Sequence, residues 1–194
     1  FRMGMDYYVN GMDRHEKLLV MQEKTANKNF KPSTKLEKKH IYLHMKDRGI
    51  PLKSLIVSDK WFGKTFKTGF GMYGYFTIIG PEPYYEIVKW FALAVLIYSL
   101  ANVLIRGSTA DMTLAAVVVM MSIALIGASL HHSWTMDFQA QGRYLFPILP
   151  MFGVLLGRCR TLFETRLFVL SVSQLYLLGL YSFIFVALMN IPRG

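Results

Sequence analysis

Cysteine and acidic side chains are scarce in this chain of 194 residues. Its single cysteine, Cys159, excludes an intrachain disulfide and a zinc site built from several cysteines. The sequence also lacks the phosphate-binding loop of P-loop NTPases, the GxSxG nucleophile motif, the HExxH zinc motif and the glycine fingerprint of dinucleotide-binding proteins. These absences argue against the commonest nucleotide-dependent and hydrolytic enzymes, and we expect neither a metal ion nor a cofactor.

The 12 Asp and Glu residues are outnumbered by 22 Lys and Arg residues, which gives a net charge of +10 at pH 7. The excess is concentrated in residues 1–69, where 15 basic and 7 acidic side chains give a local net charge of +8. The remainder carries long apolar runs, and the mean hydropathy of the whole chain is +0.32. This division predicts a basic extramembrane segment joined to a membrane-embedded region, and it excludes a water-soluble monomer.

Four apolar stretches approach or reach the roughly 20 residues that a helix needs to cross a bilayer. They cover residues 87–105, 112–130, 143–157 and 167–189. The third is short and contains Pro147 and Pro150, which kink a helix unless its neighbours satisfy the freed carbonyl groups. The fold class we expect is an all-α membrane protein, with about four transmembrane helices in residues 86–194.

Two segments precede this region. Residues 1–60 form a basic segment of mixed structure, in which we predict a short amphipathic helix over residues 35–51 and a strand over residues 52–58. Residues 61–85 are rich in glycine and aromatic side chains. Aromatic residues gather where spans meet the membrane surface, so this segment is either an interfacial anchor or a re-entrant element that lines a cavity.

Basic residues in short loops indicate the orientation of the spans. Arg106 follows the first span, and Arg158, Arg160 and Arg166 follow the third, so these ends share one side. The loop after the second span, residues 131–142, has no Lys or Arg. The basic residues of the N-terminal segment argue for the opposite orientation, but long segments cross membranes largely regardless of charge. We therefore expect residues 1–85 and 131–142 outside the cytoplasm.

The most informative polar residues open the third span: Gln141, Gly142, Arg143 and Tyr144, called here the QGRY segment. A guanidinium is a planar fork that grips phosphate through two parallel hydrogen bonds. Glycine lets the backbone approach a ligand, and tyrosine can donate or stack. The pattern predicts a phosphate site at head-group depth. The alternative is that Arg143 only anchors the helix end to lipid phosphates.

Other residues could line a cavity near this site: Trp61, Phe66, Phe70, Tyr73, His131, His132 and Asp137. Adjacent histidines point in different directions on a helix, so we assign the pair to polar contacts at the membrane surface and not to a metal. The lysine-rich residues 24–39 lack an aromatic platform for base stacking, and we expect no nucleic acid partner. The spans hold almost no ionisable side chain, which argues against a transporter.

The sequence QGRYLFPILP at residues 141–150 is preceded by GFGMYGYF and PEPYYEI within residues 69–87. Together they resemble the C-terminal part of a bacterial family of polytopic membrane proteins of unknown function, which is grouped with the GT-C glycosyltransferases. The resemblance covers roughly residues 60–160. It implies sugar transfer from a polyprenyl-phosphate-linked donor at the outer face of the bacterial cytoplasmic membrane, with the QGRY segment binding the donor phosphate.

GT-C enzymes activate the acceptor hydroxyl with an acidic residue in their first extracytoplasmic loop, and no part of this chain matches that loop. Asp6 is only weakly similar to the acidic residue of that loop, and we leave the catalytic residue unassigned. Because the chain begins at Phe1 and not at methionine, we interpret it as a piece of a longer protein. Its expected partners are membrane lipids, the lipid-linked sugar, and further helices or membrane subunits. The alternative function is a non-catalytic membrane subunit of a larger complex.

Overall fold

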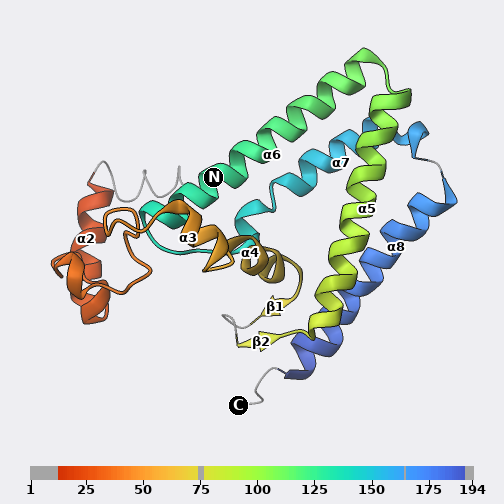
Figure 1. Cartoon of the computed structure of the whole chain (residues 1–194). Helices are drawn as coiled ribbons and strands as arrows, with labels where there is room; N and C mark the ends of the chain where they lie inside the picture. Colours follow the sequence, from red (N-terminus) through yellow and green to blue (C-terminus); the bar gives the residue numbers. More distant parts are fainter. Residues whose placement is uncertain (1–12, 74–76, 164, 191–194) are drawn as a thin grey trace. The chain divides into compact units, whose positions relative to one another are not determined.

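The computed structural model describes residues 13–73, 77–163 and 165–190, and it is mostly helical (Figure 1). The chain divides into two compact units. The first comprises Phe1–Leu52 and Trp134–Phe138, and the second comprises Lys53–Ser133 and Gln139–Gly194. Each unit is held together by its own backbone and side-chain contacts.

The described part of the first unit begins with the helix α2 (Arg14–Thr25). Two 3₁₀ turns follow, η1 (Lys28–Phe30) and η2 (Leu36–Lys38). Beyond η2 the chain forms turns, so the amphipathic helix that we predicted over residues 35–51 is wrong.

Arg48 explains why this stretch does not form a helix. Its half-buried guanidinium donates hydrogen bonds to four backbone oxygens, those of Leu36 (2.6 Å), Lys39 (2.8 Å), His40 (3.2 Å) and Leu43 (3.0 Å). Carbonyl groups that converge on one side chain cannot also point along a helix axis toward the amides four residues ahead. The turns are therefore stabilised by a side chain whose role the helical spacing of the apolar residues does not reveal.

The segment Trp134–Phe138 completes the first unit by backbone pairing. The amide of His44 donates to the carbonyl oxygen of Met136 (2.8 Å), and the amide of Lys46 donates to that of Trp134 (3.0 Å). The indole N–H of Trp134 donates to the carbonyl oxygen of Ile50 (2.8 Å). A segment distant in sequence thus supplies hydrogen-bond partners that the turns lack among themselves.

Two short helices follow, α3 (Leu52–Val57), which belongs to the second unit from Lys53 on, and α4 (Trp61–Phe70). The strand that we predicted over residues 52–58 is wrong. Leu52, Leu55 and Ile56 recur at the spacing of one helix face, and Leu55 is fully buried. After α4 the chain forms a small antiparallel hairpin of β1 (Met72–Tyr73) and β2 (Ile78–Ile79).

Three helices among the described residues are long and apolar enough to cross a membrane. They are α5 (Glu82–Arg106), α6 (Thr109–Thr135) and the C-terminal run Phe168–Asn190. That run joins α8 (Arg166–Tyr181) to the π-helical segment η5 (Ser182–Ala187) and the turn η6 (Leu188–Asn190). Only 11–22% of their apolar windows is buried within the chain, so their surfaces require cover by lipid or by other helices. The chain is therefore a mostly helical protein with three candidate membrane spans.

The fourth predicted span, residues 143–157, is not confirmed. The chain there forms a 3₁₀ turn, η3 (Gly142–Leu145), followed by the helix α7 (Ile148–Arg158). Pro147 caps the start of α7, where its missing amide proton costs nothing. The 11 residues of α7 span roughly 16 Å, about half of a bilayer core.

Two buried clusters hold the second unit together. One lies where α5 ends and α6 begins, and consists of Val103, Ala115, Val118, Leu155, Cys159 and Phe163. The other joins Tyr84, Tyr85 and Val88 of α5 to Phe66 of α4 and to Leu175 and Leu178 of α8. Helices α5 and α8 lie side by side (Figure 1), and α4 is packed against the beginning of α5.

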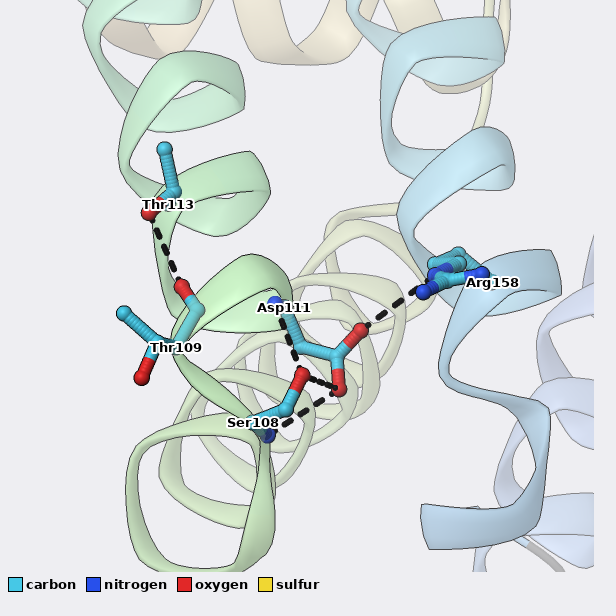
Figure 2. A network of polar contacts seen from close by, with 5 residues as sticks. All are labelled: Ser108, Thr109, Asp111, Thr113 and Arg158. Atoms are coloured by element: carbon cyan, nitrogen blue, oxygen red, sulfur yellow. Dashed lines mark hydrogen bonds and ion pairs between the residues drawn. The ribbon is translucent and has the colours of Figure 1, made fainter.

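A reciprocal hydrogen-bonded cap closes the start of α6 (Figure 2). The Ser108 hydroxyl donates to Oδ2 of Asp111 (2.7 Å), and the Asp111 amide donates back to Oγ of Ser108 (3.3 Å). Oδ1 of Asp111 lies 3.5 Å from Nε of Arg158 at the end of α7. This capping box therefore also ties the start of α6 to the end of α7.

Candidate functional site

The QGRY segment is anchored to α4 by a close contact between two glycines. A Cβ atom on Gly142 would lie 2.4 Å from Cα of Gly69, and a Cβ on Gly69 would lie 3.4 Å from Cα of Gly142. The amide of Gly142 donates to the Thr68 hydroxyl (2.7 Å), which in turn lies 3.1 Å from the carbonyl oxygen of Ala140. The two segments that carry the family resemblance are therefore in direct contact, and Gly142 allows the backbone to approach Gly69.

Arg143 lies on the exposed side of this turn. Its Nη2 donates to the hydroxyl of Tyr144 (3.3 Å), and its guanidinium carbon is 5.2 Å from the centroid of the Tyr144 ring. The Tyr144 hydroxyl donates to the side-chain oxygen of Gln139. No carboxylate of the described residues pairs with Arg143. The guanidinium is thus positioned by neutral groups and retains donors for an anion.

A cavity of about 450 Å³ adjoins this cluster. It is lined by Leu125, Ala128, Ser129, His132, Gln139 and Tyr144. Tyr144 belongs both to this lining and to the cluster around Arg143. An anion bound by Arg143 could therefore have a polar neighbouring group within the cavity.

A second cavity, of about 630 Å³, also borders the QGRY segment. Gly142 contributes to its wall, whereas Arg143 and Tyr144 do not. Its apolar walls are formed mainly by Phe62, Phe66, Phe70, Ile126, Phe146, Ile148 and Leu149. Tyr85, Glu86, Lys67 and Lys89 supply the polar groups. The volume is typical of ligand sites, which span roughly 300–1,000 Å³.

Each lysine of the larger cavity has an acidic neighbour. Nζ of Lys67 is 2.5 Å from Oε1 of Glu82, and it is 5.3 Å from the centroid of the Tyr85 ring. Nζ of Lys89 is 2.5 Å from Oε2 of Glu86. The Glu82 side chain is 71% exposed, so the Lys67–Glu82 pair is a surface ion pair.

The remaining predicted site residues lie in different surroundings. Trp61 is fully buried and donates its indole N–H to Oγ of Ser133 (2.9 Å). Tyr73 lines a third cavity, of about 380 Å³, together with Gly71, Tyr84 and Leu175. His131 is exposed on α6.

Asp137 belongs to the first unit, where it pairs with Leu43 in an isolated β-bridge. In the described part of the chain, no three His, Cys, Asp or Glu side chains come together as a metal site would require.

Sequence reasoning singled out Phe66 and Phe70 as cavity-lining residues, and both line the larger cavity, but it did not name Phe62 or the other walls. Phe62, Phe66 and Phe70 are four residues apart, the spacing that aligns side chains on one face of a helix. That signal was available in the sequence. It becomes informative only once residues 61–70 are taken as a helix, whereas the glycines in this stretch favour an irregular segment.

Comparisons with protein-family models, with curated proteins and with solved structures found no match to this chain. The resemblance to GT-C glycosyltransferases therefore rests on the residues of the QGRY segment and of residues 69–87 alone.

Proposed function

We propose that this chain is the C-terminal portion of a GT-C-like glycosyltransferase that uses a polyprenyl-phosphate-linked sugar at the extracytoplasmic face of the bacterial cytoplasmic membrane. One observation carries the proposal. Arg143 is exposed, has no carboxylate partner among the described residues, and is positioned by Tyr144 beside a cavity. An arginine held in this way favours a phosphate ligand over a structural ion pair.

In the proposed reaction the acceptor hydroxyl attacks the anomeric carbon of the donor sugar. The bond between that carbon and the phosphate oxygen breaks, and the polyprenyl phosphate leaves with the electron pair. Arg143 stabilises the negative charge that develops on this phosphate, and a general base takes the proton of the acceptor. We assign the base to no residue of this chain, so the proposed role of the chain is donor binding.

Replacing Arg143 by lysine tests the proposal, because an ammonium is a point charge and cannot form two parallel bonds to a phosphate. Hydrogen bonds to charged groups contribute about 1.5–3 kcal/mol each, so Arg143→Lys should reduce sugar transfer by the complete protein roughly 10- to 100-fold. The measurement is transfer of a radiolabelled sugar from a polyprenyl-phosphate donor. Arg106→Lys, at the exposed end of α5, is the matched control and should leave transfer unchanged.

A non-catalytic membrane subunit is the second candidate, and the exposed surfaces of the three membrane helices favour it. Such surfaces suit packing against partner helices as well as against lipid. A simple membrane anchor accepts lysine in place of arginine, since both side chains reach the head groups. Equal expression of Arg143→Lys and the wild-type protein, with unchanged sugar transfer, would reject donor binding by Arg143 and favour the subunit.

A further inference from the structure

The larger cavity is separate from the polar cavity beside Arg143, and the two share no lining residue. Its walls are almost entirely apolar, with Phe62, Phe66 and Phe70 along one face of α4. A polar ligand would gain little there. A hydrocarbon chain suits such walls, because it has no polar group that would lose hydrogen bonds there.

Ionisable groups occur only where the cavity meets α4 and the first turns of α5. Lys67 and Lys89 supply two positive charges to the lining, and Glu86 supplies one negative charge. Glu82, the partner of Lys67, does not belong to the lining. The lining therefore presents two ammonium groups, each with a carboxylate neighbour, where the candidate membrane helix α5 begins, which is the level at which lipid head groups lie.

The two ion pairs do not prevent the lysines from binding another anion. Both pairs are on the surface, and exposed ion pairs contribute little to stability. Either ammonium can therefore turn from its carboxylate to a phosphate at small cost. An ammonium on a flexible stem is suited to this exchange.

We propose that the larger cavity binds one acyl chain of an anionic bilayer phospholipid, with the head-group phosphate held by Lys67 and Lys89. The hydrocarbon chain lies against the phenylalanines of α4 and against Phe146 and Leu149. This site goes beyond the proposed sugar transfer and does not depend on it, because it uses neither Arg143 nor Tyr144.

A competition experiment tests the proposal. The full chain is purified in non-ionic detergent and loaded with a fluorescent phosphatidylglycerol, and unlabelled compounds are then added to displace this probe. Unlabelled phosphatidylglycerol should displace the probe, and phosphatidylcholine should require roughly tenfold more, because its head group carries no net charge for the lysines. Inorganic phosphate should not displace the probe. Displacement by inorganic phosphate would identify a free-anion site, and equal competition by both lipids would show that the site does not select an anionic head group; either result overturns the proposal.

Substitutions separate the head-group contact from the chain contact. The double variant Lys67→Gln, Lys89→Gln should lower the affinity for phosphatidylglycerol roughly tenfold or more. It should lower the affinity for phosphatidylcholine by less, because the choline cation already offsets the charge of that lipid's phosphate. Gly63→Phe should weaken the binding of both lipids at least roughly tenfold, since Gly63 belongs to the cavity wall and an aromatic ring there occupies the path of the chain.

Gly153→Phe in α7 is the matched control for the chain contact. A Cβ atom meets nothing within 4 Å at either Gly63 or Gly153, and phenylalanine is a better helix former than glycine, so both variants should fold. Gly153 lies outside the cavity lining, and its substitution should leave lipid binding unchanged. Wild-type binding by Gly63→Phe, or equal loss in both glycine variants, would overturn the proposal. Sugar transfer is not measured, so failure of the proposed function would leave these outcomes unaffected.

Discussion

Gly142 determines where Arg143 lies. A methyl group on residue 142 would lie 2.4 Å from Cα of Gly69, 2.5 Å from its nitrogen and 2.6 Å from the carbonyl oxygen of Thr65. All three are backbone atoms, so no side-chain rotation can relieve the overlap. The QGRY segment can keep its place against α4 only with glycine at this position.

We expect Gly142→Ala to lower the free energy of unfolding by about 1–3 kcal/mol, the usual cost of forcing extra atoms into a packed site. Gly153→Ala is the control: it lies inside α7 with nothing within 4 Å of the new Cβ, and it should gain up to about 1 kcal/mol from helix propensity. Thermal unfolding in detergent, followed by circular dichroism, measures both. Equal melting temperatures for the two variants would contradict the tight contact.

Arg48 has a comparable role in the first unit, through hydrogen bonds and not through packing. Arg48→Lys should lower the free energy of local unfolding by about 1–3 kcal/mol, because one ammonium cannot reach the four carbonyl oxygens that the guanidinium joins. Hydrogen exchange should accelerate for the amides of residues 36–50. The amides of α5 serve as the internal control, and unchanged exchange in both regions would show that the turns do not depend on Arg48.

At the scale of elements, the sequence predicts best the long helices, because these depend on long apolar stretches. The helices α5 and α6 and the C-terminal helical run were expected, because stretches of about 20 predominantly apolar residues have no stable place in water. Short elements were predicted poorly. The turns around Arg48 and the pairing with Trp134–Phe138 depend on contacts between distant parts of the chain, which no local pattern records.

The candidate site was predicted in part for the same reason. The QGRY segment has a recognisable sequence of its own, so it could be singled out without the structure, and its role in binding phosphate stays a prediction. The larger cavity requires one face of α4 to meet α5, α6 and α7, and α4 also contacts Gly142 of the QGRY segment. One helix of 10 residues therefore contacts the QGRY segment, where we propose a phosphate site, and also forms part of the apolar cavity, which the sequence alone does not show.

The capping box at the start of α6 should contribute measurably to stability. Ser108→Ala removes the hydroxyl that bonds Asp111, and we expect a loss of about 1 kcal/mol. Thr109→Ala is the matched control, because only the backbone oxygen of Thr109 takes part in the network, accepting from the Thr113 hydroxyl (2.8 Å; Figure 2). Thermal unfolding measures the difference. A loss for Thr109→Ala as large as that for Ser108→Ala would argue against the cap.

At the scale of the whole molecule, the charges of the second unit bear on its orientation in the membrane. One end carries Arg106, Arg158, Arg160 and Arg166, and the other carries Lys60, Lys64, Lys67 and Arg143. The first group lies beside short connections between helices, whereas most of the second precedes α5 in a segment longer than 60 residues. Short loops determine orientation, so we expect the first group in the cytoplasm.

Cysteine labelling with a membrane-impermeant reagent tests this orientation. Native Cys159 is only 2% exposed, so it would react poorly on either side of the membrane, and burial also raises the pKa of its thiol. We therefore choose two exposed residues, Ser58 and Thr161, and replace each by cysteine in a Cys159→Ala background. Ser58→Cys should be labelled in intact cells. Thr161→Cys should be labelled only after the membrane is permeabilised.

The reverse labelling pattern would bear differently on the two proposals. Arg143 follows the end of α6, and α4 begins beside Ser133 near the same end, through the hydrogen bond between Trp61 and Ser133. Labelling of Thr161→Cys alone in intact cells would place this end in the cytoplasm, where an extracytoplasmic sugar donor cannot reach Arg143. The proposed transfer would then be rejected. The proposed binding of an anionic phospholipid would not be rejected, because the larger cavity needs only a lipid head group at the level where α5 begins.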